Sequence, residues 1–227
     1  MSLSPPLLSS RRAVLGAFGL AALAVAALPL RSGAAPAKRR VVTILGDSIT
    51  AGYGLRAQDA LPAQLGAALA RLGANAEVRG AGLSGDTTGG GLARLDFSVQ
   101  SDTSVCVVEL GGNDVLQGLP PATTRANLDR ILARLKARGI KAVLCGLNAP
   151  SSLSVSFARD FNRIYPDLAR RHGVALYPNL LAGVAMTAGL NQADGLHPNP
   201  RGVKIIAARL APVVAHALKS PALNVRA

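Results

Sequence analysis

Short apolar runs alternate with segments of helical period along most of the chain. The runs are Val41–Leu45, Ala76–Val78, Val105–Leu110, Ala142–Leu147 and Val174–Tyr177, of which the second is the weakest. Apolar runs of this length, bounded by turn residues, are typical of buried strands. Strands that alternate with helices build parallel sheets covered on both faces. The pattern therefore predicts an α/β fold with a five-stranded parallel sheet.

The clearest helical pattern is ATTRANLDRILARLKARG, at residues 122–139. Its apolar residues recur at the i, i+3, i+4 and i+7 positions of one stripe: Leu128, Ile131, Leu132 and Leu135. Such a stripe predicts a helix with one face in the core. Thr123 or Thr124 is expected to cap its start, and Gly139 its end. A last helix is expected to begin with Asn199 as N-cap and Pro200 at the first helical position.

Five segments of this chain are expected to border the functional crevice. In parallel sheets the crevice lies beyond the carboxyl ends of the strands. Four of the segments follow predicted strands, at residues 46–54, 79–91, 111–121 and 148–156. Residues 191–198, before the last helix, are added because they are polar and include a histidine.

Residues 1–37 have the pattern of an export signal. Arg11 and Arg12 precede an uncharged, Ala-rich run, Ala13–Leu30, and an A-x-A site ends at Ala37. The paired arginines resemble a twin-arginine signal and predict a contact with export machinery. An uncleaved membrane anchor is the alternative, and the modest hydropathy and glycines of the run disfavour it. We therefore expect one domain at residues 38–227, without stable membrane insertion, in the periplasm or outside the cell.

Composition narrows the possible partners of this domain. The formal net charge is +13, but the basic residues are scattered, and aromatic residues make up only 3% of the chain. Because single-strand nucleic-acid binders stack bases on aromatic side chains, no nucleic-acid partner is expected. Cys106 lies early in its predicted strand and Cys145 late in its own, so two buried free thiols are expected rather than a disulfide. No cluster of side chains has the spacing of a metal site.

Elimination among three histidines indicates one candidate catalytic base. His172 ends a predicted helix, where a cation suits the helix dipole, and His216 lies in the last helix. His197 instead lies in a polar loop, three residues after Asp194. In a single turn this spacing can bring the carboxylate to the imidazole Nδ1–H and leave Nε2 free. Taken alone, the D-x-x-H pattern is a weak signal.

Ser48 is the candidate nucleophile, because a strand-like run ends just before it in GDSITAGYG. A serine hydroxyl needs a base to attack a carbonyl, and the resulting oxyanion needs hydrogen-bond donors. Gly82 and Asn113 follow other predicted strands and could supply them, although each could equally be an ordinary turn residue. Residues 80–85 also match G-x-G-x-x-G, but the weak strand ahead of them disfavours a dinucleotide site.

Four segments together resemble the SGNH (GDSL-type) hydrolase family: GDSITAGYG, GAGLSGDTT, GGND and DGLHP. They occur in the family's order. The residues beside and between them are similar to those of the bacterial arylesterases and thioesterases of the family. The resemblance implies a flavodoxin-like three-layer α/β/α sandwich. It implies Ser48 as nucleophile, His197 as base and Asp194 as its orienting carboxylate. It also implies an oxyanion hole made of Ser48, Gly82 and Asn113. Asp47 resembles a structural turn or cap residue.

The resemblance predicts a serine esterase that hydrolyses carboxylic esters or thioesters, including acyl-CoA or lysophospholipid, without a metal or organic cofactor. Five apolar residues in or beside strand-end loops are candidates for an acyl site, and equally for ordinary packing: Leu83, Val115, Leu116, Leu119 and Leu153. One alternative is a carbohydrate O-acetylesterase, which the scarcity of sugar-stacking aromatics disfavours. Another is a catalytically silent binding module, which the complete Ser, His and Asp set disfavours.

Overall fold

The computed structural model describes residues 40–150 and 152–220. The predicted export signal at residues 1–37 lies outside the described residues. Within residues 40–150 and 152–220, no helix combines the length and hydropathy needed to cross a membrane.

The strands form one parallel sheet in the order β2-β1-β3-β4-β5. Their bounds are β1 (Arg40–Gly46), β2 (Ala76–Gly82), β3 (Thr103–Glu109), β4 (Lys141–Cys145) and β5 (Ala175–Tyr177). The chain steps from β1 to β2 on one side and crosses to β3 on the other. A topological switch point therefore lies between β1 and β3, which is where ligands bind in open α/β sheets. The five-stranded parallel sheet predicted from the sequence is confirmed.

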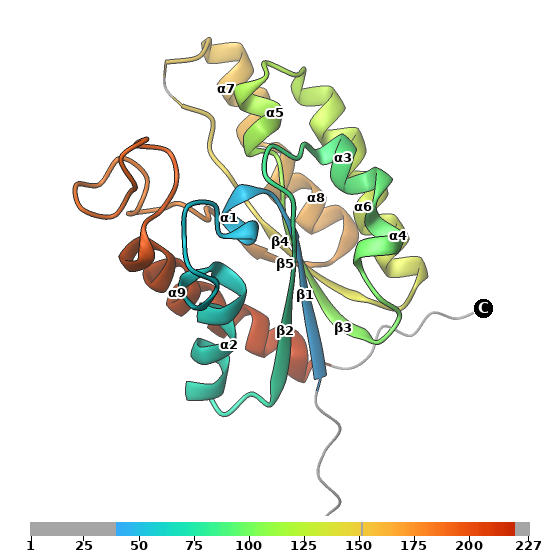
Figure 1. Cartoon of the computed structure of the whole chain (residues 1–227). Helices are drawn as coiled ribbons and strands as arrows, with labels where there is room; N and C mark the ends of the chain where they lie inside the picture. The colour runs from blue at the N-terminus through green and yellow to red at the C-terminus, as the bar shows by residue number, and fades with distance from the viewer. Residues whose placement is uncertain (1–39, 151, 221–227) are drawn as a thin grey trace, which may run out of the picture. The chain divides into compact units, whose positions relative to one another are not determined.

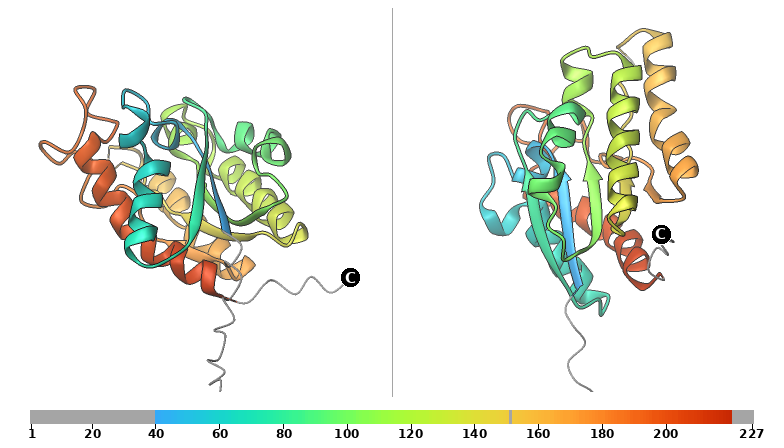
Figure 2. Two further views of the ribbon diagram at one scale, coloured as in Figure 1. Left: turned by 60° about the horizontal axis from the view of Figure 1, so that its bottom comes forward. Right: turned by 90° about the vertical axis from the view of Figure 1, so that its right-hand side faces the viewer.

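The helices cover both faces of this sheet (Figures 1 and 2). On one face lie α2 (Leu61–Arg71) and α9 (Pro200–Lys219), which pack against each other. The other face carries α3 (Thr88–Ala93), α4 (Leu95–Ser98), α6 (Pro121–Ala137), α7 (Val155–Asn162) and α8 (Ile164–His172). Two short helices at the carboxyl end of the sheet, α1 (Ser48–Ala51) and α5 (Gly112–Leu116), follow β1 and β3. A 3-10 turn, η1 (Ala57–Asp59), precedes α2. The three-layer architecture agrees with the expectation.

The edge strand β2 is longer than its short apolar run indicated. Its residues are half-buried or exposed, so its sequence lacks the strong apolar signal of β1 and β3. The strand continues to Gly82, which pairs with Gly46 of β1. Gly80 and Gly82 of the G-x-G-x-x-G match therefore lie in the strand itself rather than in a phosphate-binding turn.

The caps of the two long helices differ in how well the sequence predicted them. Asn199 caps α9 as expected, because its Oδ1 accepts from the backbone N–H groups of Arg201 and Gly202 at 3.0 and 3.1 Å. The prediction that Thr123 or Thr124 caps α6 was wrong. That helix begins at Pro121, and Pro120 lies at its N-cap without a side-chain bond. Thr124 is fully buried and donates its hydroxyl to Asp114 instead.

The cysteines lie at different heights of the sheet, as predicted. Cys106 pairs with Ala142 across β3 and β4, three residues before Cys145. Both thiols are free and buried, and burial raises the pKa of Cys106 to about 12 and that of Cys145 well above its ordinary value. At such pKa values the nucleophilic thiolate form is scarce, so both cysteines belong to the core.

Candidate active site

Ser48 opens α1 directly beyond the carboxyl end of β1. Asp47 is the N-cap of this helix, and its Oδ1 accepts from the backbone N–H of Ile49 at 3.0 Å. This confirms the cap role expected of Asp47. The helix ends after one turn at Gly52, whose φ of 75° suits a residue without a Cβ. Strand, cap and short helix therefore hold the Ser48 side chain at the edge of the sheet.

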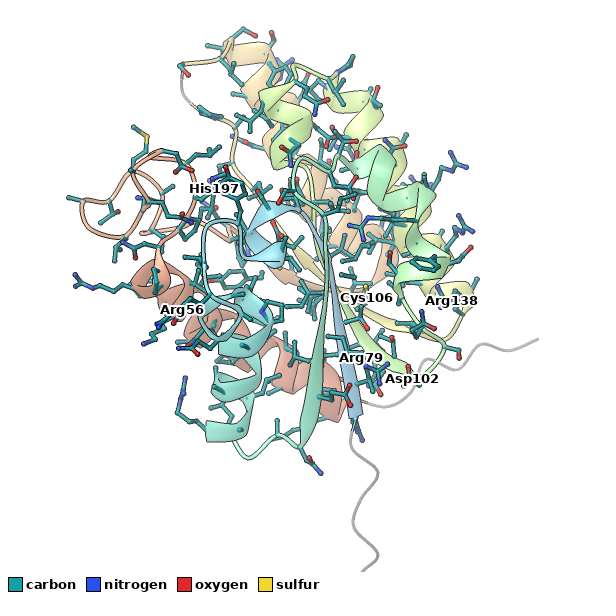
Figure 3. The ribbon with its side chains drawn as sticks, in the orientation of Figure 1. Arg56, Arg79, Asp102, Cys106, Arg138 and His197 are labelled. Carbon is teal, nitrogen blue, oxygen red and sulfur yellow. The ribbon has the colours of Figure 1, made fainter. Side chains whose placement is uncertain are left out.

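The structure brings Ser48, His197 and Asp194 together, although the first two lie 149 residues apart. The Nε2 atom of His197 lies 2.9 Å from the Ser48 Oγ, and its Nδ1 atom lies 2.6 Å from Asp194 Oδ2. A carboxylate at Nδ1 favours the tautomer with the proton on that nitrogen. Nε2 is then an acceptor facing the serine hydroxyl. Figure 3 shows His197 beside α1 at the carboxyl end of the sheet.

Asp194 is held by its own turn. Its Oδ1 accepts from the backbone N–H groups of Leu196 at 2.9 Å and His197 at 3.0 Å. The bond from the His197 backbone, then that from the His197 ring and that from the Leu196 backbone, lower the pKa of Asp194 to about 2. The carboxylate is therefore ionised at any pH at which the protein is expected to work, and it can stabilise an imidazolium next to it.

The loop that carries His197 is joined to the turn after Ser48. Gln192 donates its side-chain amide to the Tyr53 carbonyl at 2.8 Å. A Cβ on Gly54 would lie 2.2 Å from Gln192 Oε1, so only glycine allows this approach. The Tyr53 ring packs on the His197 ring with centroids 4.7 Å apart. Tyr53 N also donates to Ser48 O at 3.0 Å, so His197 and Ser48 share one support.

Asn113 lies at the start of α5, on the other side of Ser48. Its Nδ2 donates to the Asp86 carbonyl at 2.8 Å and faces Asp47 Oδ2 at the longer distance of 3.3 Å. The next residue, Asp114, is fully buried. It accepts from the backbone N–H of Thr88 at 2.8 Å, from the Thr88 hydroxyl and from Thr124 Oγ1 at 3.0 Å. These bonds anchor α5 to α3 and α6.

Gly82 does not lie where the resemblance implied. It is the last residue of β2, and a Cβ there would meet Ala51 N at 2.2 Å, so its Cα packs against α1. Gly85 lines the cavity instead. It has a φ of +82° in a turn closed by the bond from Asp86 N to Leu83 O. Position i+2 of such a turn favours glycine, which was the available sequence signal.

A cavity of about 260 Å³ opens next to Ser48. Its lining combines polar residues, among them Ser48, His197 and the cap residue Asp47, with apolar side chains: Asp47, Ser48, Ile49, Tyr53, Ser84, Gly85, Gly112, Asn113, Leu116, Leu196 and His197. Leu116 is the one member of the five predicted acyl-site residues in this lining. Ile49 and Leu196 are the sequence neighbours of Ser48 and His197, and Tyr53 follows Ser48 by five residues in the same segment, which was the signal that could have found them.

The other four predicted acyl-site residues lie outside this lining. Val115 packs against the core, because neighbouring positions on a helix face different directions and α5 turns Leu116 outward. Leu119 is half-buried, and Leu83 and Leu153 are exposed on their loops.

A model of the GDSL-like lipase/acylhydrolase family matches residues 44–205, a span that includes Ser48, Asn113, Asp194 and His197. The chain belongs to this family. As a member it is a carboxylic ester hydrolase. This acylhydrolase is similar in sequence to three proteins of known name. It is 37% identical to esterase TesA of Pseudomonas aeruginosa over 71% of this chain and 81% of that protein. It is 35% identical to an arylesterase of Vibrio mimicus over 78% and 88% of the two chains.

The third relative is thioesterase 1/protease 1/lysophospholipase L1 of Escherichia coli K12. It is 36% identical over 76% of this chain and 84% of that protein. Among solved structures, AlinE4, an SGNH-hydrolase family esterase, superposes with a TM-score of 0.68. The two chains are 42% identical, and the match covers 82% of this chain and all of AlinE4.

Two buried carboxyl groups lie beneath the Ser48 turn of this acylhydrolase. Burial raises the pKa of Asp47 to about 6. Burial, followed by the nearby Asp47, raises the pKa of Glu109 well above its ordinary value. Glu109 Oε2 accepts from Thr50 Oγ1 at 2.7 Å and from Asp47 N at 3.3 Å, which ties the end of β3 to α1. Across residues 40–150 and 152–220, no three His, Cys, Asp or Glu side chains cluster so as to hold a metal ion.

Proposed function

We propose that this acylhydrolase cleaves short-acyl and aryl carboxylic esters through an acyl-enzyme on Ser48. The observation that carries the proposal is the continuous chain from Asp194 through His197 to the Ser48 hydroxyl, with distances of 2.6 and 2.9 Å. His197 Nε2 takes the hydroxyl proton as Ser48 Oγ attacks the carbonyl carbon. The imidazolium then gives this proton to the leaving group, and water repeats the cycle on the acyl-enzyme.

The oxyanion of this reaction would be stabilised by the backbone N–H groups of Ser48 and Gly85 and by the Asn113 side chain. All three residues line the cavity. Asn113 Nδ2 has two hydrogens, and its bond to Asp86 O is shorter than its contact with Asp47 Oδ2. The oxyanion would replace the longer of these two, so the donor needs no rotation to serve the transition state. Donors that are held in advance in this way stabilise charge without reorganisation.

The size and lining of the cavity support small, uncharged substrates. Its volume of about 260 Å³ lies just below the usual range of sites for drug-sized ligands. Ile49, Tyr53, Leu116 and Leu196 supply apolar contact for an acyl chain or an aryl ring. Among the described residues, its lining includes neither Lys nor Arg, so the phosphates of a CoA thioester would lack a cation there. We therefore propose that aryl and alkyl esters react faster than acyl-CoA.

The site of action follows from the first 37 residues. We propose that they direct export through a twin-arginine route and that the domain works in the periplasm or outside the cell. Replacing Arg11 and Arg12 by lysine should keep the protein in the cytoplasm, as measured by cell fractionation. Unchanged export of that variant would contradict the twin-arginine assignment.

The proposed chemistry can be tested on residues 38–227. The test combines fluorophosphonate labelling with turnover of p-nitrophenyl esters of two to twelve carbons, acetyl-CoA and palmitoyl-CoA. Wild type should be labelled and should prefer the short esters. Ser48→Ala should lose labelling and turnover, whereas Ser101→Ala, at an exposed serine outside the cavity, should keep both. Full activity of Ser48→Ala would refute the nucleophile assignment, and an inactive, unlabelled wild type would refute the proposed function.

A further inference from the structure

Arg94 joins three segments of the chain next to the proposed oxyanion donors. It lies at the joint between α3 and α4, and its side chain is only 19% exposed. The guanidinium donates to Asp86 Oδ2 at 2.7 Å, to Ala81 O at 2.9 Å and to Gly46 O at 2.9 Å. A fourth bond, to Ser98 Oγ at 3.1 Å, fixes the side chain against its own helix.

Three of the four partners of Arg94 directly adjoin a part of the site. Gly46 is the last residue of β1, two residues before Ser48. Ala81 lies near the end of β2, just before the turn that carries Gly85. Asp86 follows Gly85, and its carbonyl is the acceptor that holds the Asn113 amide. One guanidinium thus connects the nucleophile strand, the Gly85 turn and the partner of the third donor.

We propose that Arg94 is the positioning residue that sets the spacing among the oxyanion donors. This inference rests on the proposed function. The planar guanidinium reaches two carbonyls and a carboxylate at fixed angles, which an ammonium group cannot do. Without that guanidinium, backbone pairing still holds the Gly85 turn to the end of β1, as in the bond from Leu83 N to Gly46 O at 3.1 Å, but the turn is less constrained relative to the Ser48 turn. Transition-state stabilisation falls because it depends on donors held at the developing charge.

A purely structural role would have a different signature, and the chain offers a matched control. Arg138 is also mostly buried, with a side chain that is 26% exposed, and it also donates to a carboxylate and a carbonyl, those of Asp96 and Val99. Figure 3 shows Arg138 near α4 and α6, on the far side of the sheet from His197. Loss of either guanidinium should lower the stability of the fold, whereas only loss of the Arg94 guanidinium should lower kcat.

The test compares Arg94→Lys with Arg138→Lys, using residues 38–227 and p-nitrophenyl butyrate. Rates are expressed per active site titrated with a fluorophosphonate, and thermal unfolding is recorded for each variant. Arg94→Lys should lower kcat and kcat/KM together by about 10- to 100-fold, with KM within about threefold of wild type. Arg138→Lys should keep kcat within about threefold, although both variants unfold at lower temperature.

For the two lysine variants, either of two results would overturn the proposal. One is an Arg94→Lys variant whose kcat per active site stays within about threefold of wild type. The other is an equal loss of kcat in Arg138→Lys. If Arg94→Lys does not fold, Asp86→Asn removes the charge of one partner. It should lower kcat at unchanged KM, and an unaltered kcat would equally overturn the proposal. Wild type and Ser48→Ala are assayed alongside, so a failure of ester hydrolysis itself would appear as absent wild-type turnover.

Discussion

Replacing Asp194 with asparagine should move the ring proton of His197 from Nδ1 to Nε2. The carboxylate accepts at both oxygens: Oδ1 from two backbone N–H groups and Oδ2 from the His197 ring. An amide can accept at only one of these positions. Placing its NH₂ group at the Oδ1 position would oppose two fixed donors, whereas placing it at the Oδ2 position opposes one ring nitrogen that can change its tautomer. The asparagine should therefore donate to Nδ1.

The consequence for Ser48 follows from the 2.9 Å contact with His197 Nε2. With Nδ1 as acceptor, Nε2 carries the proton and points it at the Ser48 hydroxyl. It then cannot take the hydroxyl proton. A serine triad held in this wrong tautomer loses about 10⁴-fold in kcat, while the oxyanion donors and substrate contacts remain. Asp194→Asn should therefore show a loss of about 10⁴-fold in kcat, with KM changed little.

Asp129→Asn is the matched control, because Asp129 Oδ1 lies 2.7 Å from His172 Nε2 in a second Asp–His pair, between α6 and α8. That variant should keep wild-type kcat. Both variants are assayed on a short p-nitrophenyl ester, with Ser48→Ala as the background rate and thermal unfolding as the check on folding. A kcat of Asp194→Asn within about tenfold of wild type would show that Asp194 does not determine the tautomer.

Two further predictions concern the cap and the cavity. Burial raises the pKa of Asp47 from 3.8 to about 6, so the stability that this carboxyl contributes is present below about pH 4 and is lost as the pH rises through 6. Asp47→Asn should therefore stabilise the fold at pH 8, on the order of 1–3 kcal/mol, and hardly at pH 4. Urea unfolding at the two pH values measures this, and an equal effect at both would contradict the assignment. Leu116→Ala should raise KM for a hexanoate ester about fivefold and leave that for acetate unchanged, since a longer chain would reach Leu116. Leu83→Ala, outside the cavity, should change neither KM, and equal effects of the two variants would count against the proposed acyl site.

The sheet was predictable from the sequence because its central strands are buried on both faces. The apolar runs of β1, β3 and β4 could be recognised as strands from their own residues alone. A short continuous apolar run is typical of a strand that is buried on both faces of a parallel sheet. The edge strand β2 is half-exposed and rich in glycine, so the sequence pattern predicts a loop where the strand in fact continues to Gly82. That error placed Gly82 in the cavity, whereas the added length of β2 places Gly85 there.

Ser48, Asp194 and His197 could be proposed as a set because the chain has only three histidines and the strand-end position of Ser48 can be recognised in the sequence. Histidines are scarce in this chain. An Asp three residues before a loop histidine can reach its imidazole within a single turn, so the spacing itself predicts the contact. The choice between neighbouring apolar residues after β3 had no such signal. Whether Val115 or Leu116 faces the substrate depends on where a five-residue helix begins, and that is set by the contacts of Asp114 with two other helices.

The bonds that support the site fall into two sets made by different residues, although the His197 loop is joined to the turn after Ser48. The half that carries the proposed oxyanion donors lies at the ends of β1, β2 and β3 and is held by Arg94 and Asp114. The base half is the loop before α9, held by Gln192 on the turn that follows Ser48. Damage to the base half should slow proton transfer while leaving the donors in place, and damage to the oxyanion half should do the reverse. Asp194→Asn and Arg94→Lys should therefore act almost independently, so that the double variant loses about the product of the two single losses in kcat, down to the rate that remains without the triad.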